Sequence, residues 1–352
     1  MTTIPPQHAT YMTENSCKYE VSKKSHTYEN SLKEYLNNYG GVGASAVVID
    51  QGSVNFFSCG KKSLTLNEKP SEKTLFEMGS ITKVFTTFLL VNFVAEGKLK
   101  LDDPIETYFP SVAFPEFDGK KITFRHLATH HSGLPELPNN LKSKSLNPYK
   151  PYSIDDLKNF LSACHLESTP GETFHYSDIG MGLLGYILSQ IEGKSYEELL
   201  SGYIFQPLGM EDSGISSDQK ENLATGHALG NEVEYFEMAE IFQGAGALYS
   251  NTSDMAKFLS ANMGFLETST KKLLTTCHQF QGESFPTMGV GLGWLIAPNS
   301  NTGDIIWHSG KTGGFRSFLG FNTKTQKGVV ILANSTEDWP RLLALEILNG
   351  NK

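Results

Sequence analysis

The stretch Phe76-Glu77-Met78-Gly79-Ser80-Ile81-Thr82-Lys83-Val84-Phe85-Thr86 contains the residues around which the rest of the chain can be interpreted. Ser80 follows a glycine and opens an apolar run that continues to Ala95, which predicts a buried helix over 80–95. Residues three apart share a helix face, so Lys83 lies beside Ser80. A serine hydroxyl is a weak nucleophile without a neighbouring base, and a buried lysine is costly without a partner. The pair therefore predicts that Ser80 is a nucleophile and that Lys83 takes part in the transfer of its proton.

The Ser-x-x-Lys pattern by itself is a weak signal, because it occurs four times, at Ser58, Ser80, Ser217 and Ser269. Ser58 ends a predicted strand at a glycine turn, and the last two copies lie in polar stretches. Only Ser80 follows a glycine and enters a long apolar segment. At the start of a helix its backbone N–H has no intrahelical partner and can face a developing oxyanion.

Composition narrows the class of protein. The 352 residues carry a formal charge of −9 and 39% apolar side chains, without a block of Lys and Arg, which argues against a nucleic-acid partner. The apolar segment 85–95 is too short and too polar to span a bilayer, and the first residues show no signal-peptide pattern. We expect a cytoplasmic protein as the sequence stands, or a periplasmic or secreted one if an export signal has been removed.

The pattern of apolar residues and turns predicts strands near both ends of the chain and helices between them. Strands are expected at 43–50, 54–59, 289–296, 305–308, 315–322 and 328–333. Helices are expected at 29–38, 80–95, 154–164, 179–191, 196–203, 253–263 and 341–348, with Ser253 as an N-cap, and a long loop at 133–152. These elements predict an α/β (α+β) fold in which one antiparallel sheet is built from both chain ends, flanked by helices, with a mostly helical insertion. The expected division is a lead-in at 1–27, a sheet domain from 28–103 and 285–352, and a helical domain at 104–284.

Several segments together resemble one family. Besides 76–86, they are Ile122-Thr123-Phe124-Arg125-His126-Leu127-Ala128-Thr129-His130-His131-Ser132-Gly133-Leu134-Pro135 and Gly244-Ala245-Gly246-Ala247-Leu248-Tyr249-Ser250, which runs on to Asp254. The chain resembles the serine β-lactamases and penicillin-binding proteins over about residues 40–335, and is most similar to the class C, DD-peptidase and related esterase branch. This resemblance implies a β-lactamase/transpeptidase-like fold and an acyl-enzyme formed at Ser80.

The family's second motif is Tyr-x-Asn, and the resemblance places it at Tyr176-Ser177-Asp178. It implies that Tyr176 takes the Ser80 proton and later activates water, and we expect the Lys83 ammonium to lower the pKa of this tyrosine. Asp178 departs from the usual asparagine. An ionised carboxylate can pair with Lys83 but cannot donate a hydrogen bond to a substrate amide, which argues against efficient β-lactam hydrolysis. The other matches to the motif stand at Tyr28, Tyr35 and Tyr249, the first two before the nucleophile and the third in a segment whose tyrosine is not catalytic in the family.

The third motif of the family is Lys-Thr-Gly on a strand, four residues before a Gly-Phe pair. A literal copy stands at 311–313, but Gly314-Phe315 is the pair, and counting back gives His308-Ser309-Gly310 as the equivalent triplet. The resemblance implies that His308 contacts a substrate carboxylate or the Tyr176 hydroxyl, and that Ser309 and Gly310 line the substrate site. Lys311 then supplies the second oxyanion N–H from its backbone, beside that of Ser80.

Other chemistries find less support in the sequence. His126, His130 and His131 form no His-Glu-x-x-His pattern, so we expect neither a metal nor another cofactor. Gly-x-Ser-x-Gly and Ser-Asp-Asn are both absent, which argues against an α/β-hydrolase and a class A β-lactamase.

The expected partner is a small-molecule or peptide substrate. It is a β-lactam, a D-amino-acid peptide or a carboxylic ester, and the last two are favoured. Two alternatives remain open: an acyltransferase that uses the same acyl-enzyme, and a non-enzymatic penicillin-binding sensor. The sequence leaves the oligomeric state open.

Overall fold

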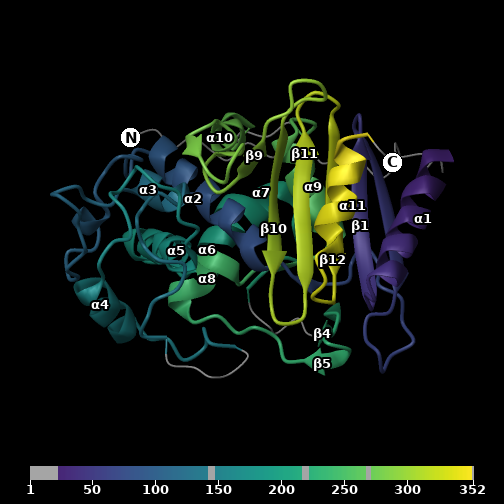
Figure 1. The fold of residues 1–352 in the computed structure, drawn as a ribbon, viewed down its shortest axis with the longest axis horizontal. Coiled ribbons are helices and arrows are strands. Elements are labelled where there is room, and N and C mark those ends of the chain that lie inside the picture. Colours follow the sequence, from purple (N-terminus) through teal and green to yellow (C-terminus); the bar gives the residue numbers. More distant parts are fainter. Residues whose placement is uncertain (1–22, 142–146, 216–221, 267–270, 351–352) are drawn as a thin grey trace, which may run out of the picture.

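Both ends of the chain contribute to one antiparallel sheet at the centre of the fold (Figure 1). The computed structural model describes residues 23–141, 147–215, 222–266 and 271–350. In spatial order the strands are β2 (Ser53–Gly60), β1 (Gly43–Asp50), β12 (Lys327–Ala333), β11 (Arg316–Asn322), β10 (Ile305–Lys311), β9 (Leu295–Ala297), β8 (Gly289–Val290) and β7 (Gly282–Glu283). The predicted α/β class and the joining of the two chain ends are confirmed, since β1 pairs directly with β12.

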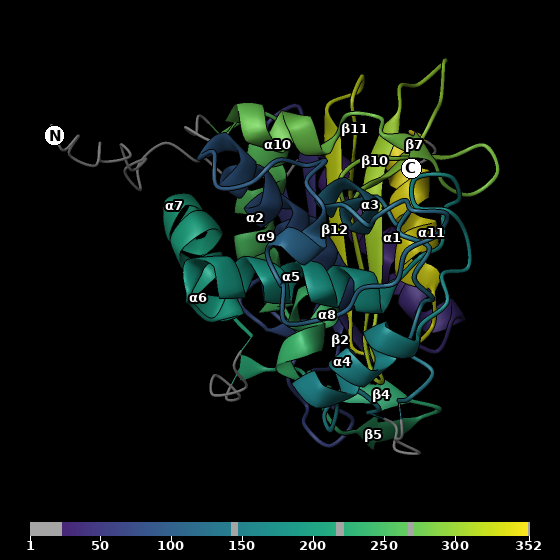
Figure 2. The same ribbon diagram turned by 90° about the vertical axis from the view of Figure 1, so that its left-hand side faces the viewer.

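The central strands are apolar on both faces, which is why helices cover the sheet on both sides. Successive side chains of a strand point to opposite faces. In β1, Ala46 and Val48 pack into one core cluster, whereas Val47 and Ile49 pack into another. Helices α1 (Lys23–Asn38) and α11 (Trp339–Leu348) cover the first face, and α2 (Thr82–Ala95) and α9 (Thr252–Asn262) lie on the second (Figure 2).

The remaining helices lie beyond α2 and enclose it. They are α3 (Phe124–Ala128), α4 (Ile154–Ala163), α5 (Asp178–Glu192), α6 (Tyr196–Leu200), α7 (Gln206–Leu208), α8 (Gln243–Gly246) and α10 (Lys271–Cys277). Two short antiparallel pairs accompany them, β3 (Phe76–Glu77) with β6 (Tyr249–Ser250) and β4 (Gly226–Ala228) with β5 (Asn231–Val233).

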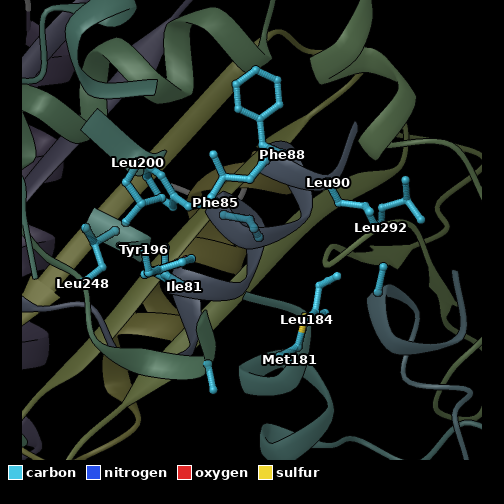
Figure 3. Close-up of a cluster of buried hydrophobic side chains, with 14 of the residues drawn as sticks. Ile81, Phe85, Phe88, Leu90, Met181, Leu184, Tyr196, Leu200, Leu248 and Leu292 are labelled. Carbon is cyan, nitrogen blue, oxygen red and sulfur yellow. The ribbon is translucent and has the colours of Figure 1, made fainter. Parts of the chain in front are cut away.

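The packing around α2 fixes the direction of the segment that carries Ser80. Phe85 and Phe88 of α2 are buried, as are Leu184 of α5 and Leu200 of α6, and Figure 3 shows these side chains gathered around the helix. A helix that is apolar on every side is stable only inside the molecule. Burying each of these large side chains contributes about 1.5–3 kcal/mol, so α2 is held firmly in place.

Several expected boundaries were wrong. The first helix begins at Lys23, inside the expected lead-in. The N-cap of α9 is Asn251, not Ser253, because the Asn251 side chain accepts a hydrogen bond from the Asp254 N–H. The expected strand at 289–296 is interrupted where Gly293 has a φ of +73°, which an L side chain rarely adopts. The expected helix at 196–203 is α-helical only to Leu200, and a π-helical turn follows at 201–205.

None of the helices in the described ranges has the length and the apolar character that a membrane span requires.

Candidate active site

The turn that carries Ser80 is shaped by glycines. Gly79 has a φ of +50°, and a Cβ there would lie 2.8 Å from the backbone N and O of Lys311. A Cβ on Gly310 would lie 2.0 Å from the carbonyl oxygen of Met78. Only glycine permits both the positive φ and this close approach. The end of β10 therefore lies directly against the Ser80 turn, which is a 3₁₀ turn over Gly79–Ile81 that leads into α2.

Lys83 is fully buried, and three oxygen atoms surround its ammonium group. Nζ lies 2.9 Å from Ser80 Oγ, 2.8 Å from the Ala245 carbonyl oxygen and 2.8 Å from Asp178 Oδ1. A buried charge is tolerated when it is paired and hydrogen-bonded, and these contacts meet that condition. The ion pair with Asp178 was expected. The contact with Ala245 was not, because it uses a backbone carbonyl oxygen, which a sequence motif cannot identify.

The ion pair keeps Lys83 protonated. Burial lowers the pKa of Lys83, but the Asp178 carboxylate and the Tyr176 side chain raise it by more, and the net pKa lies above the usual 10.5. Lys83 is therefore an ammonium at neutral pH and acts as a base only after losing a proton.

Tyr176 lies just before α5 and contacts both members of the Ser80–Lys83 pair. Its side chain hydrogen-bonds with Lys83 and Ser80, and the Lys83 Nζ is 4.9 Å from the centre of its ring. The expected effect of Lys83 on the pKa of Tyr176 is confirmed, but it does not decide the net shift. Burial raises the pKa of Tyr176 above 10.0, Lys83 lowers it and Asp178 raises it, so the net shift is upward. The Asp178 charge offsets that of Lys83, and the phenol is neutral at rest.

His130 holds the Tyr176 segment in place, a role that the sequence did not reveal. The two rings are stacked with centroids 4.5 Å apart, and His130 Nδ1 accepts a hydrogen bond of 3.0 Å from the Ser177 N–H. Burial, and then the Lys83 charge, hold the pKa of His130 well below its usual value, so the ring is neutral. In the sequence, His130 is distinguished only as one of two adjacent histidines that form no metal-binding pattern.

The residues of the third motif lie on β10. His308 is 3% exposed, its ring centroid is 6.3 Å from that of Tyr176, and its Nδ1 lies 2.7 Å from the Ser309 carbonyl oxygen. Burial and the Lys83 charge lower the pKa of His308 to about 3, so the imidazole is uncharged at neutral pH. Gly310 packs on Met78, as described above, and Lys311 ends the strand with an exposed side chain.

Asp178 forms the opposite side of the cluster. It is the first residue of α5, its side chain is 16% exposed, and its Oδ2 accepts a hydrogen bond of 3.4 Å from the Tyr149 hydroxyl. Burial, and then the Asp178 charge, raise the pKa of Tyr149, which keeps this phenol protonated as a donor. Tyr149 lies in the expected 133–152 loop, where nothing in the sequence distinguished it.

The structure therefore brings Ser80, Lys83, Tyr176 and Asp178 into contact, with His308 next to Tyr176. A nucleophile, a lysine and a tyrosine that share hydrogen bonds can transfer a proton and support covalent acyl transfer.

Comparison with known proteins identifies the family of the chain. A beta-lactamase of Escherichia coli K12 is 28% identical over 346 residues, which cover 88% of this chain and 88% of that protein. The D-alanyl-D-alanine-carboxypeptidase/endopeptidase AmpH of the same strain is 28% identical over 311 residues, covering 83% and 79%. The solved structure of a class C beta-lactamase has a TM-score of 0.83 at 24% identity and covers 97% of this chain and 99% of its own. The family model described as Beta-lactamase matches residues 29–348, and the chain therefore belongs to the beta-lactamase family.

Proposed function

We propose that this protein is a serine hydrolase that forms an acyl-enzyme at Ser80 and acts on a carboxylic ester or a peptide in preference to a β-lactam. The observation that carries the proposal is the 2.9 Å contact between Lys83 Nζ and Ser80 Oγ, with Tyr176 hydrogen-bonded to both side chains.

The proton of Ser80 passes to the Lys83–Tyr176 pair. Both groups are protonated at rest, because the pKa of each is raised. The pair must lose one proton before it can accept the one from Ser80, and this loss belongs to the pair and not to either residue alone. Ser80 Oγ then bonds to the substrate carbonyl carbon, and the pair returns the proton to the leaving group. In the second step the same pair removes a proton from water, whose oxygen attacks the acyl carbon. The bond from that carbon to Ser80 Oγ then breaks, the pair returns the proton to Oγ, and the acid leaves.

The oxyanion of each tetrahedral intermediate is assigned to the backbone N–H groups of Ser80 and Lys311. The support is the packing of β10 on the Ser80 turn, since a Cβ on Gly79 would lie only 2.8 Å from the Lys311 nitrogen. Two fixed N–H donors at a developing charge contribute a large part of such a rate enhancement.

The charges of the site favour substrates other than β-lactams. His308 stands where the family pattern puts a residue that contacts a substrate carboxylate, and its pKa of about 3 leaves it uncharged. Asp178 replaces an amide donor with a carboxylate that is bound to Lys83. A substrate carboxylate therefore gains little here, and a substrate amide loses a hydrogen-bond donor. These losses affect a simple ester least, because it has neither group.

A panel of three substrates tests the proposal: a short-chain nitrophenyl ester, a D-Ala-D-Ala peptide and a chromogenic cephalosporin. We expect faster turnover of the ester or the peptide than of the cephalosporin, and loss of every activity in Ser80→Ala. Ser58→Ala is the matched control, because Ser58 has the same Ser-x-x-Lys spacing on β2. Full activity of Ser80→Ala would refute the mechanism.

Intact-protein mass spectrometry separates turnover from a stable Ser80 adduct, which would indicate a sensor. Adding an alcohol or amine separates hydrolysis from acyl transfer.

A further inference from the structure

Glu77 is a buried carboxylate three residues before Ser80 that the mechanism above does not use. It lies on β3 and is 3% exposed. Its Oε1 accepts a 2.6 Å hydrogen bond from the Phe236 N–H and one of 3.4 Å from the Tyr249 hydroxyl. An ionised carboxylate in the interior is costly unless hydrogen bonds compensate the lost hydration. The hydrogen bonds to Oε1 compensate this cost only in part, because Oε2 is buried without a hydrogen-bond partner among the described residues.

These contacts join the segment of Ser80 to the segment that follows β10. The Phe236 ring lies over Gly313, where a Cβ would be 2.5 Å from the ring carbon Cε1. The Thr312 hydroxyl lies close enough to favour the ionised form of Glu77. The preceding residue, Lys311, has its backbone against the Ser80 turn. Glu77 is therefore linked through Phe236 to the segment that carries the second proposed oxyanion donor.

We propose that ionised Glu77 is a positioning residue, which holds the 311–313 segment against the Ser80 turn and keeps the two oxyanion N–H groups aligned. This inference rests on the proposed function. Charge-assisted hydrogen bonds are shorter and stronger than neutral ones, so protonation of Glu77 weakens its hydrogen bond with the Phe236 N–H and, through the Phe236 ring, its hold on Gly313.

The environment of Glu77 makes this loss occur near neutral pH. Burial raises its pKa from 4.5 to about 7, although Thr312, the Phe236 N–H and Tyr249 lower it, and none of these groups is a cation. Burial also raises the pKa of Tyr249 and of Tyr235, the neighbouring phenols, so both are neutral in this range. The Glu237 carboxylate, which also raises the pKa of Tyr249, is paired with Lys150 at 2.7 Å. We therefore expect kcat to rise through about pH 7 as Glu77 ionises, below the rise that belongs to the Lys83–Tyr176 pair.

The experiment measures kcat and KM for the nitrophenyl ester between about pH 5 and about pH 9 in four proteins. In Glu77→Gln the rise near neutrality should disappear, with kcat about tenfold below wild type at about pH 8 and KM nearly unchanged, because only transition-state contacts weaken. In Thr312→Val the rise should move to higher pH, since a group that lowers the pKa of Glu77 is gone. Ser250→Ala is the control: Ser250 follows Tyr249 on β6, but its hydroxyl bonds Ser213 at 2.8 Å, so the rise should stay in place.

A rise that persists unchanged in Glu77→Gln, or a wild-type profile that is flat through neutrality, would overturn the inference. If Glu77→Gln does not fold, the direction of the shift in Thr312→Val decides.

A wild-type protein without turnover refutes the proposed function, and denaturant unfolding then tests Glu77 separately. The wild-type unfolding midpoint should fall as pH rises from about 5 to about 8, because the folded state binds the proton more tightly, and that of Glu77→Gln should not. Equal pH dependence in both proteins overturns the inference.

Discussion

Replacing Asp178 by asparagine removes one charge from the buried pair with Lys83 and keeps the shape of the side chain. The two charged atoms are 2.8 Å apart, Lys83 is fully buried and Asp178 is 16% exposed. Removing one partner of a buried ion pair costs about 3–5 kcal/mol, because the other charge stays buried without compensation. Asparagine still offers an oxygen to the Lys83 Nζ, and Ser80 and Ala245 also remain bonded to it. We therefore expect a loss of about 2 kcal/mol, which is less than a buried charge without any partner would cost.

The same substitution should change the pH dependence of catalysis. Asp178 raises the pKa of both Lys83 and Tyr176, so its removal lets the pair lose its proton at lower pH. The alkaline rise of kcat/KM should move to lower pH. Lys83 has a folded pKa above its unfolded value, so its contribution to stability is complete below about 10.5 and is lost only at higher pH. The loss of stability in Asp178→Asn should therefore be constant from about pH 6 to about pH 9.

Denaturant unfolding and a pH–rate profile for the same ester measure the two effects. Glu136→Gln is the matched control, because Glu136 is an exposed carboxylate whose backbone carbonyl accepts a hydrogen bond of 3.0 Å from the Asp178 N–H. It should change stability by less than about 0.5 kcal/mol, as surface substitutions usually do. Wild-type stability together with an unmoved pH–rate profile in Asp178→Asn would refute the view that this ion pair governs the proton of Lys83.

Three further substitutions test other parts of the site. Tyr176→Phe keeps the ring stacked on His130 and loses the hydroxyl, so kcat should fall about 10²–10⁴-fold with an unfolding midpoint close to wild type; a small loss of kcat would remove Tyr176 from the mechanism. Gly79→Ala forces a Cβ into the β10 backbone, so it should lower the activity and the thermal unfolding midpoint far more than Gly97→Ala does. Gly97 has a similar φ of +72° but open space around it. Equal losses in the two variants would mean that φ alone matters. Glu77→Gln should gain stability relative to wild type between about pH 5 and pH 8, by up to about 3 kcal/mol, because the raised pKa of Glu77 destabilises the folded state once the group ionises; a constant difference in the free energy of unfolding would contradict this sign.

The parts of the fold that follow from local patterns could be predicted from the sequence. Short apolar runs and the turn between them indicated β1 and β2, and the apolar run after Ser80 indicated α2. The boundaries that failed depend on contacts distant in sequence. The 289–296 strand breaks because the Leu292 N–H donates to the Cys277 carbonyl oxygen at 2.9 Å, a contact that alternation cannot reveal.

Some features of the candidate site could also be predicted from the sequence, and others depend on how distant segments pack. Lys83 and Asp178 could be paired in advance, since one buried charge demands another. The direction of the Tyr176 pKa could not, because the sequence indicates a nearby cation but not the depth of burial or the neutralising carboxylate. Ala245 and His130 act through a carbonyl oxygen and a ring nitrogen whose positions depend on how distant segments pack.

The pairing of β1 with β12, and the approach of Gly310 to Met78, give the order of synthesis a consequence for activity. While a ribosome is still making the second half of the chain, Ser80 has already emerged. Strand β10, which packs against the Ser80 turn, has not yet been synthesised. Contacts so far apart in sequence form slowly. A nascent chain released before residue 311 should therefore have no hydrolase activity. The moment at which turnover first appears during translation would show when the C-terminal strands join the sheet.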